Sequence, residues 1–221
     1  MRQLSILKTL SLAVLIVLGL CVQSNKVSAA PTETLTVAGG CFWCVEADFE
    51  SVRGVRGAVS GFTGGKIANP TYKQVTGGGT GHYEAVQIAF DPDVVSRDRL
   101  LDLFFRSIDP TDAGGQFCDR GASYRTAIFP ANDAQRKAAE AAKARAEAAL
   151  GRKIVTPILK AAPFYPADAY HQDYYRSDDR LAVTSVGIGV KKSTAYKRYR
   201  KNCGRDARVK QLWGANAPFV N

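Results

Sequence analysis

The sequence has few of the residues that metal and phosphate sites need. Only two of its 221 residues are histidine, His82 and His171, and no second close pair of cysteines or histidines accompanies Cys41 and Cys44. A zinc site therefore lacks half of its ligands. The glycine-rich stretches contain no Gly-Lys-Ser/Thr element, and no G-x-S-x-G element occurs, which argues against a phosphate loop and a serine hydrolase. We expect neither a metal nor a bound cofactor.

Long apolar stretches are missing as well. The most apolar one, TLSLAVLIVLGLCV, has about 14 residues, whereas a transmembrane helix needs about 20. Basic residues precede it and VSAA follows it, which is the pattern of a secretory signal. We predict that residues 1–30 form a signal peptide, cleaved after Ala29 or Ala30, and that the protein is exported to the periplasm. An uncleaved membrane anchor and, through Cys21, a lipoprotein are the alternatives.

Acidic residues are scarce at one end of the chain. The last 31 residues hold nine Lys and Arg, and Asp206 is their one acidic residue. Residues 31–190 hold 18 Lys and Arg and 19 Asp and Glu, so most of the net charge of +10 lies outside them. We divide the chain into the signal, one folded domain at 31–190 and a basic tail at 191–221. Such tails can bind nucleic acid or acidic lipid. We expect a solvated tail that packs in part, no nucleic-acid partner, and a monomer.

The apolar pattern predicts an α+β domain with an irregular C-terminal tail. Strict alternation indicates a strand at 83–90, and Ser96 is the expected cap of an amphipathic helix at 96–108. Strands and helices do not alternate regularly, which favours α+β over α/β. The other expected elements are strands at 34–38, 55–62, 123–129 and 153–159, helices at 41–52 and 132–151, glycine-rich loops at 63–81 and 111–122, and an aromatic loop at 161–175.

Four cysteines follow the predicted signal: Cys41, Cys44, Cys118 and Cys203. An exported protein can form disulfides, and four cysteines allow three complete pairings. A domain of this size does not need them for stability, so reactive thiols are as plausible as structural ones.

Cys41 is expected at a strand-to-helix turn, in GGCFWC. A helix N-terminus favours the thiolate, which is the nucleophilic form of cysteine. The preceding glycines allow backbone to approach a ligand closely, and Phe42 and Trp43 are candidates for an apolar wall. A buried structural cysteine or a stable Cys41–Cys44 disulfide are the alternatives.

Glu84 shares a strand face with the apolar residues Val86, Ile88 and Phe90. Burial among such residues raises the pKa of a carboxyl group, so Glu84 is a candidate proton donor near neutral pH. The alternative is a glutamate at the exposed end of its strand. Several tyrosines lie in or beside loops, and composition does not choose among them.

Five stretches occur in an order that resembles the peptide methionine sulfoxide reductase A family, across roughly residues 35–176. The resemblance implies a two-layer sandwich around a mixed sheet and reduction of the S epimer of methionine sulfoxide, free or in proteins. The KNCGRD tail is similar to that of a bacterial branch. The five stretches are GGCFWCVEADF, GFTGG with NPTY, TGHYEAVQIAFDP, GQFCDRGASYRTAIF and FYPADAYHQDYY.

The resemblance also implies residue roles. Cys41 matches the nucleophile and Glu84 the acid, and the Cys41 sulfenic acid formed by the reaction would be resolved as a disulfide and reduced by a thioredoxin-like protein. The remaining matches are Tyr72 and Tyr124 for the sulfoxide oxygen, Phe42 and Trp43 for the substrate methyl group, and Asp119 and His171 as further site residues.

Cys44 departs from the simplest family pattern, so three thiols are candidates to resolve the sulfenic acid: Cys203 and Cys44 about equally, then Cys118. Two other functions stay open. One is a general thiol–disulfide oxidoreductase that uses Cys41 and Cys44, and the other is a module that binds oxidised methionine without turnover.

Overall fold

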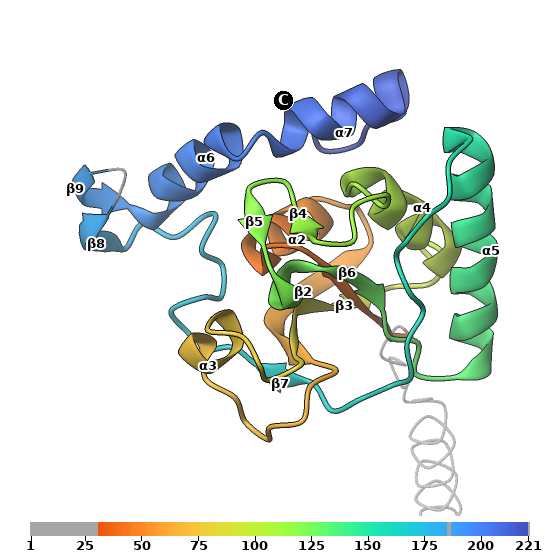
Figure 1. Cartoon of the computed structure of the whole chain (residues 1–221), viewed down its shortest axis with the longest axis horizontal. Coiled ribbons are helices and arrows are strands. Elements are labelled where there is room, and N and C mark those ends of the chain that lie inside the picture. Colours follow the sequence, from red (N-terminus) through yellow and green to blue (C-terminus); the bar gives the residue numbers. More distant parts are fainter. Residues whose placement is uncertain (1–30, 185–186, 221) are drawn as a thin grey trace, which may run out of the picture. The chain divides into compact units, whose positions relative to one another are not determined.

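A five-stranded sheet in the order β6–β1–β3–β2–β7 forms the centre of the molecule (Figure 1). Neighbouring strands are antiparallel, and Ile128 adds one parallel bridge to Ile158 at the β6 edge. The strands are β1 (Glu33–Gly39), β2 (Val55–Thr63), β3 (Tyr83–Phe90), β6 (Thr126–Ile128) and β7 (Tyr165–Pro166).

This computed structural model describes residues 31–184 and 187–220. These residues cluster as one compact unit. The predicted signal at 1–30, with Cys21 and the cleavage site, lies outside the described residues. Within them, every helix is too short or too polar to cross a membrane.

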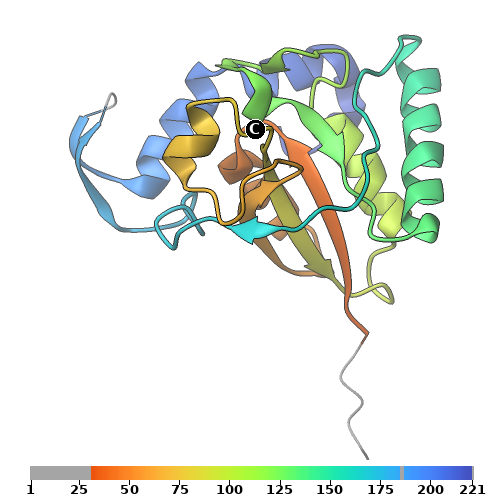
Figure 2. The ribbon, with the colours of Figure 1, turned by 60° about the horizontal axis from the view of Figure 1, so that its bottom comes forward.

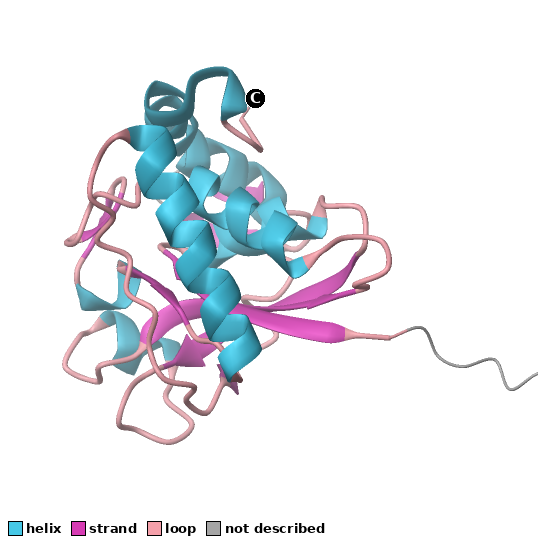
Figure 3. Ribbon diagram, turned by 90° about the vertical axis from the view of Figure 1, so that its right-hand side faces the viewer, coloured by secondary structure: helices cyan, strands magenta, loops and turns pink. Residues whose placement is uncertain are grey.

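Helices cover one face of the sheet (Figure 3). Helices α2 (Phe42–Glu50) and α4 (Arg97–Ser107) pack on the strands, and α5 (Asp133–Leu150) packs against α4. The side chains beneath them come from alternate positions of β1 and β3, because alternate residues of a strand share a face. They are Leu35, Val37, Val86, Ile88 and Phe90, all buried.

The opposite face carries a smaller apolar cluster that a loop covers. Ala38, Ala85 and Phe129 lie there beneath Leu159 and Phe164 of the segment after α5. The two layers confirm the predicted α+β sandwich. The prediction of a strand at 153–159 was wrong, because this segment forms one bridge and no strand.

The backbone of that segment pairs with β6 at one bridge, and the hydroxyls of Thr126 and Thr156 share a hydrogen bond beside it. The Ile128 N–H donates to the Pro157 carbonyl, and the Leu159 N–H donates back to Ile128. Pro157 has no N–H to extend a ladder, so the contact stays a single bridge.

The predicted Ser96 cap is confirmed, and Asn132 caps α5 in the same way. The side chains of Ser96 and Asn132 accept backbone N–H groups in the first turns of α4 and α5. Gly151 ends α5 at φ 61°, a conformation that favours glycine.

The two glycine-rich loops contain more regular structure than expected. The first includes α3 (Tyr72–Thr76), which begins with a capping box between Thr71 and Gln74. His82 orders this loop, because its ring accepts the Gly65 N–H and bonds the Ile67 carbonyl. The second loop forms β4 (Gly115–Gln116), β5 (Asp119–Arg120) and the 3-10 turn η1 (Ala122–Tyr124).

The expectation of an irregular tail was wrong. A hairpin of β8 (Arg180–Thr184) and β9 (Gly187–Lys191) leads into α6 (Lys192–Asn202), α7 (Arg205–Trp213) and the turn η2 (Gly214–Asn216). The hairpin lies at the end of the described unit opposite α5 (Figure 1, Figure 2).

Two buried arginines explain why the tail folds. Arg200 of α6 bonds Asp48 of α2 at 2.6 Å and also pairs with Asp206. Arg205, 2% exposed, donates to the carbonyls of Gly39 and Ser107. Buried cations persist only with such partners, so the basic residues of the tail are in part structural.

We expect Arg200→Ala to lower the free energy of unfolding by about 3–5 kcal/mol, because it leaves Asp48 buried without its closest cation. Urea denaturation measures the change. Lys197→Ala, an exposed position of the same helix, is the matched control and is expected to leave the midpoint almost unchanged. Equal midpoints for the two variants would contradict a structural role for the pair.

Candidate active site

Cys41 is the N-cap residue of α2, two residues after the end of β1. Gly39 and Gly40 are required for this turn. A Cβ added to Gly39 would lie 2.9 Å from a Val45 methyl group. Gly40 has φ 85°, and a Cβ added to it would lie 2.6 Å from the Cβ of Gln116. The glycines were expected to make room for a ligand. They instead let β1 enter α2 against neighbouring side chains.

Glu84 lies at the start of this helix, 1% exposed. One carboxyl oxygen, Oε2, accepts the Phe42 N–H at 3.0 Å, while Oε1 is buried without a partner. Burial raises the pKa of Glu84 to about 8, although the Phe42 N–H opposes this shift. Glu84 is therefore largely protonated at neutral pH, as its strand position predicted, with Oε1 free to interact with another molecule.

Cys41 itself differs from the sequence expectation. Burial raises its pKa well above the usual range, and neighbouring Cys44, Glu84 and Asp119 raise it further. The helix N-terminus was expected to favour a thiolate, but its first N–H is bonded to Glu84. Cys41 therefore rests as a thiol, and it must lose its proton before its sulfur can attack.

Cys44 lies one helical turn later, 2% exposed, and shares a side-chain hydrogen bond with Cys41. That bond, and the positive charges of Arg205 and Arg200, lower the pKa of Cys44 despite its burial. The tail arginines thus favour a negative charge on Cys44. Both cysteines are free thiols in the structure.

Tyr72 and Tyr124 meet beside this pair from two separate loops. Their hydroxyls share a hydrogen bond, and each interacts electrostatically with Glu84 and Cys41. Burial raises the pKa of both phenols, so both stay protonated and can donate. Tyr72 begins α3, and Tyr124 ends the turn η1.

Aromatic rings form the wall of the site. Trp43 stacks on Tyr174 at 3.9 Å between ring centroids and on His171 at 5.7 Å. His171 also stacks on Tyr72 at 4.2 Å and contacts Phe42 at 5.5 Å. These rings make the surroundings apolar, so few polar groups compete with Glu84 for a hydrogen bond to a bound molecule.

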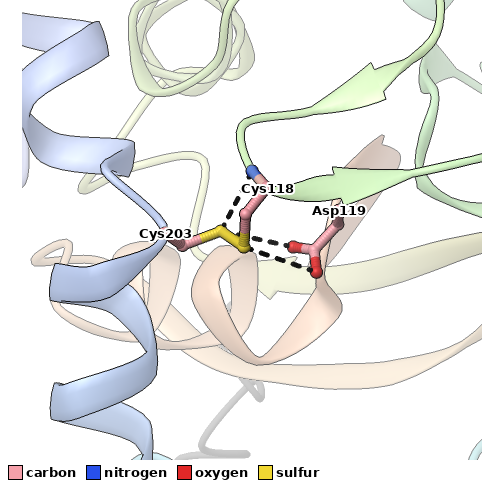
Figure 4. A group of neighbouring side chains, drawn as sticks. All are labelled: Cys118, Asp119 and Cys203. Atoms are coloured by element: carbon pink, nitrogen blue, oxygen red, sulfur yellow. Dashed lines mark hydrogen bonds between the residues drawn. A yellow bond between two sulfur atoms is a disulfide. The ribbon is translucent and has the colours of Figure 1, made fainter.

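Asp119 joins the site to a disulfide between Cys118 and Cys203 (Figure 4). Its Oδ1 lies 3.9 Å from the Cys118 sulfur and its Oδ2 lies 3.9 Å from the Cys203 sulfur, and it accepts a hydrogen bond from the Tyr199 hydroxyl. Burial raises the pKa of Asp119. Asp119 also interacts electrostatically with Cys41 and Glu84, so it lies between the disulfide and the free thiols.

Comparison with known proteins agrees with this arrangement. The family model described as peptide methionine sulfoxide reductase matches residues 33–211. The chain belongs to the peptide methionine sulfoxide reductase family. It is therefore an oxidoreductase by family, and the predicted resemblance is confirmed.

Two relatives and one solved structure illustrate the family match. The Bacillus subtilis peptide methionine sulfoxide reductase MsrA is 50% identical over 185 residues, covering 83% of this chain and 97% of that protein. The Rhizobium meliloti protein MsrA 2 is 48% identical over 189 residues, covering 86% and 87%. The reduced form of Mxr1 from Saccharomyces cerevisiae superposes with a TM-score of 0.62 at 32% identity, covering 69% of this chain and 88% of that one.

The fold gathers all the site candidates of this family member in one region. Cys41, Glu84, Tyr72 and Tyr124 interact with one another, and Phe42, Trp43 and His171 form the adjoining ring cluster. Asp119 links them to Cys118 and Cys203, and Cys44 adjoins Cys41.

Two groups of possible metal ligands occur among the described residues, and neither is well suited to an ion. In Cys118, Asp119 and Cys203 the sulfurs are bonded to each other, whereas metals bind thiolates. In the second group, Glu46 already accepts bonds from the Ser60 hydroxyl and the Asp173 N–H.

Tyr199, Tyr174 and the tail arginines were not among the predicted site residues. Tyr199 bonds Asp119 and contacts the edge of Trp43 at 6.3 Å. Its position four residues before Cys203 is a signal that sequence reasoning could have used, because residues i and i+4 share a helix face.

Proposed function

We propose that this chain reduces the S epimer of methionine sulfoxide, free or in proteins, to methionine. The observation that carries the proposal is the unpartnered Oε1 of Glu84, a buried and largely neutral carboxyl group next to the Cys41 thiol. A sulfoxide offers an oxygen that accepts a proton and a sulfur that a thiol can attack. The site provides one group for each.

The substrate methyl group would lie against Phe42 and Trp43, and its oxygen would accept hydrogen bonds from Tyr72 and Tyr124. Both phenols stay protonated, because burial raises their pKa. They orient the oxygen toward Glu84 and add polarisation without giving up a proton. Free methionine sulfoxide and oxidised proteins present the same reacting group.

Proton transfer from Glu84 to the sulfoxide oxygen makes the substrate sulfur electrophilic and leaves a carboxylate beside Cys41. The thiol then attacks, and its proton returns to Glu84. The Cys41 sulfur first bonds the substrate sulfur. The oxygen then passes to the Cys41 sulfur as the S–O bond of the substrate and the new S–S bond break, so methionine leaves and Cys41 becomes a sulfenic acid. The protons balance, so the reaction needs no thiolate at rest, in agreement with the raised pKa of Cys41.

Cys44 is the thiol placed to resolve the sulfenic acid first. It already shares a hydrogen bond with Cys41, and nearby Arg205 and Arg200 favour its thiolate. Its attack releases water and forms a Cys41–Cys44 disulfide, which a thioredoxin-like protein would ultimately reduce. In the periplasm, the location that the signal pattern at 1–30 supports, such a protein would be an exported one.

The epimer assay tests this function. Purified protein with dithiothreitol should convert methionine S-sulfoxide to methionine and leave the R epimer unchanged, as followed by chiral chromatography of both substrates. Insulin reduction in parallel measures general disulfide reductase activity, a reaction that does not need the Glu84 carboxyl group. Insulin turnover without methionine formation would favour that alternative and contradict the proposal.

A further inference from the structure

Part of the aromatic wall of the active site comes from a segment without helix or strand. Residues 167–176 form turns and irregular backbone between β7 and β8. Two of these residues, His171 and Tyr174, provide the rings that stack on Trp43. Loops hold functional side chains precisely only when a rigid scaffold positions them. Some contact with the sheet or the helices must therefore fix the two rings.

Gln172, which lies between the two ring residues in the sequence, bonds the edge of the sheet. Its Oε1 accepts the Ser60 N–H at 3.0 Å. Its Nε2 donates to the carbonyls of Ser60 at 2.8 Å and Ala167 at 2.9 Å. The carbonyl oxygen and both N–H donors of this side-chain amide are therefore used, all at ordinary hydrogen-bond lengths.

The side chain of Gln172 continues the pairing of β2 beyond the end of β7. The two strands pair at Gly61 and Phe62, and the Ala167 N–H adds a bond to the Ser60 carbonyl. Ser60 comes next along β2 and is fully buried, so its backbone N–H needs a partner. Gln172 bonds both backbone groups of Ser60, as a residue of a neighbouring strand would.

This anchor connects the aromatic wall to the strands that carry the acid. Ser60 lies two residues before Phe62, which pairs with Glu84 on the adjacent strand β3. Gln172 is directly bonded in the chain to His171, whose ring contacts both Phe42 and Trp43. The position of the wall relative to the carboxyl group is therefore set through the sheet.

We propose that Gln172 is a positioning residue for substrate binding, which holds the rings of His171 and Tyr174 against Trp43 by bonding the exposed end of the β2–β7 ladder. This inference rests on the proposed function, which places the substrate methyl group against that wall. Gln172 acts through the two rings and makes no contact with the substrate itself.

Gln172→Met tests the role, because methionine has a similar length but cannot donate to either carbonyl and is at most a weak acceptor. We expect the KM for methionine S-sulfoxide to rise about tenfold as the wall loses its position. The kcat should change much less, because Cys41 and Glu84 are held by other elements. Such a split indicates lost binding rather than a lost catalytic group. Steady-state kinetics with dithiothreitol measure both constants.

Gln135→Met is the matched control. The Gln135 side chain also joins two backbone groups, since it accepts the Ala131 N–H and donates to the Thr34 carbonyl. It lies at the start of α5, and neither partner belongs to the site. Its loss leaves backbone groups without partners in the same way and should lower stability, but KM should equal that of the parent.

Acrylamide quenching of tryptophan fluorescence gives a second measurement that needs no activity. The chain has two tryptophans, Trp43, which is half-buried, and Trp213, which is buried at the end of α7. Release of the stacked rings should open Trp43 to the quencher. The quenching constant should therefore increase in Gln172→Met and stay at the parent value in Gln135→Met.

Circular dichroism establishes that each variant is folded. If Gln172→Met does not fold, Gln172→Glu replaces it, because glutamate has the same shape and as a carboxylate loses both donated bonds. An unchanged KM or an unchanged quenching constant in the folded variant would overturn the proposal. Equal changes in Gln135→Met would also overturn it, since they would come from lowered stability. A parent that forms no methionine would overturn the proposed function, and quenching alone would then decide whether Gln172 holds the rings.

Discussion

Cys41→Ser should lower kcat/KM for methionine S-sulfoxide by at least about a thousandfold, because a buried serine hydroxyl is a far weaker nucleophile than a thiol. It also cannot carry the transferred oxygen as a sulfenic acid. The measurement is methionine formation with dithiothreitol as reductant. Circular dichroism and a urea melt establish that the variant is folded.

Cys44→Ser is the matched control, since it makes the same substitution one turn along α2. Cys44 acts after methionine has left, so this variant should still release methionine in a single turnover. Its turnover with dithiothreitol then depends on how well this small thiol reaches the Cys41 sulfenic acid. If Cys41→Ser retained activity and Cys44→Ser lost the single turnover, the two roles would have to be exchanged.

Glu84→Gln should lower kcat/KM by about 10²–10⁴-fold, because glutamine can donate a hydrogen bond but cannot transfer a proton to the sulfoxide oxygen. Steady-state kinetics of parent and variant measure the loss. Glu46→Gln is the matched control, since Glu46 is another buried carboxyl group, with a pKa raised to about 7 by burial. It bonds Ser60 and Asp173, not the site, so its rate should remain close to that of the parent.

The pH profile distinguishes proton donation from positioning. A raised pKa means that Glu84 is protonated below about pH 8 and loses its proton above it. The kcat/KM of the parent should therefore fall above that pH, by about tenfold per unit for one proton. Glu84→Gln should lack this alkaline limb. An unchanged limb in the variant would assign the titration to another group and remove Glu84 as the acid.

Local signals predicted many of the elements. Strict alternation located β3, and the helix predicted at 132–151 corresponds to α5 with its two cap residues. These features are decided within a few residues, where periodicity and capping dominate. The segment at 153–159 has the composition of a strand, but Pro157 limits it to one bridge.

The prediction for the tail failed because its stabilising contacts are distant in sequence. Arg200 lies 152 residues from Asp48, and Arg205 lies 166 residues from Gly39. Read alone, nine cations suggest a solvated segment. Their burial depends on carboxylate and carbonyl partners that only the folded chain provides.

The sequence by itself determined many of the elements, the family, and which residues could do chemistry, since these depend on neighbouring residues and on short motifs. Tertiary structure alone decided the protonation of Cys41, the pairing of Cys118 with Cys203, and the position of Asp119 near both cysteine pairs. Charge and reactivity depend on burial and on groups brought together from distant segments, and no local pattern encodes those contacts.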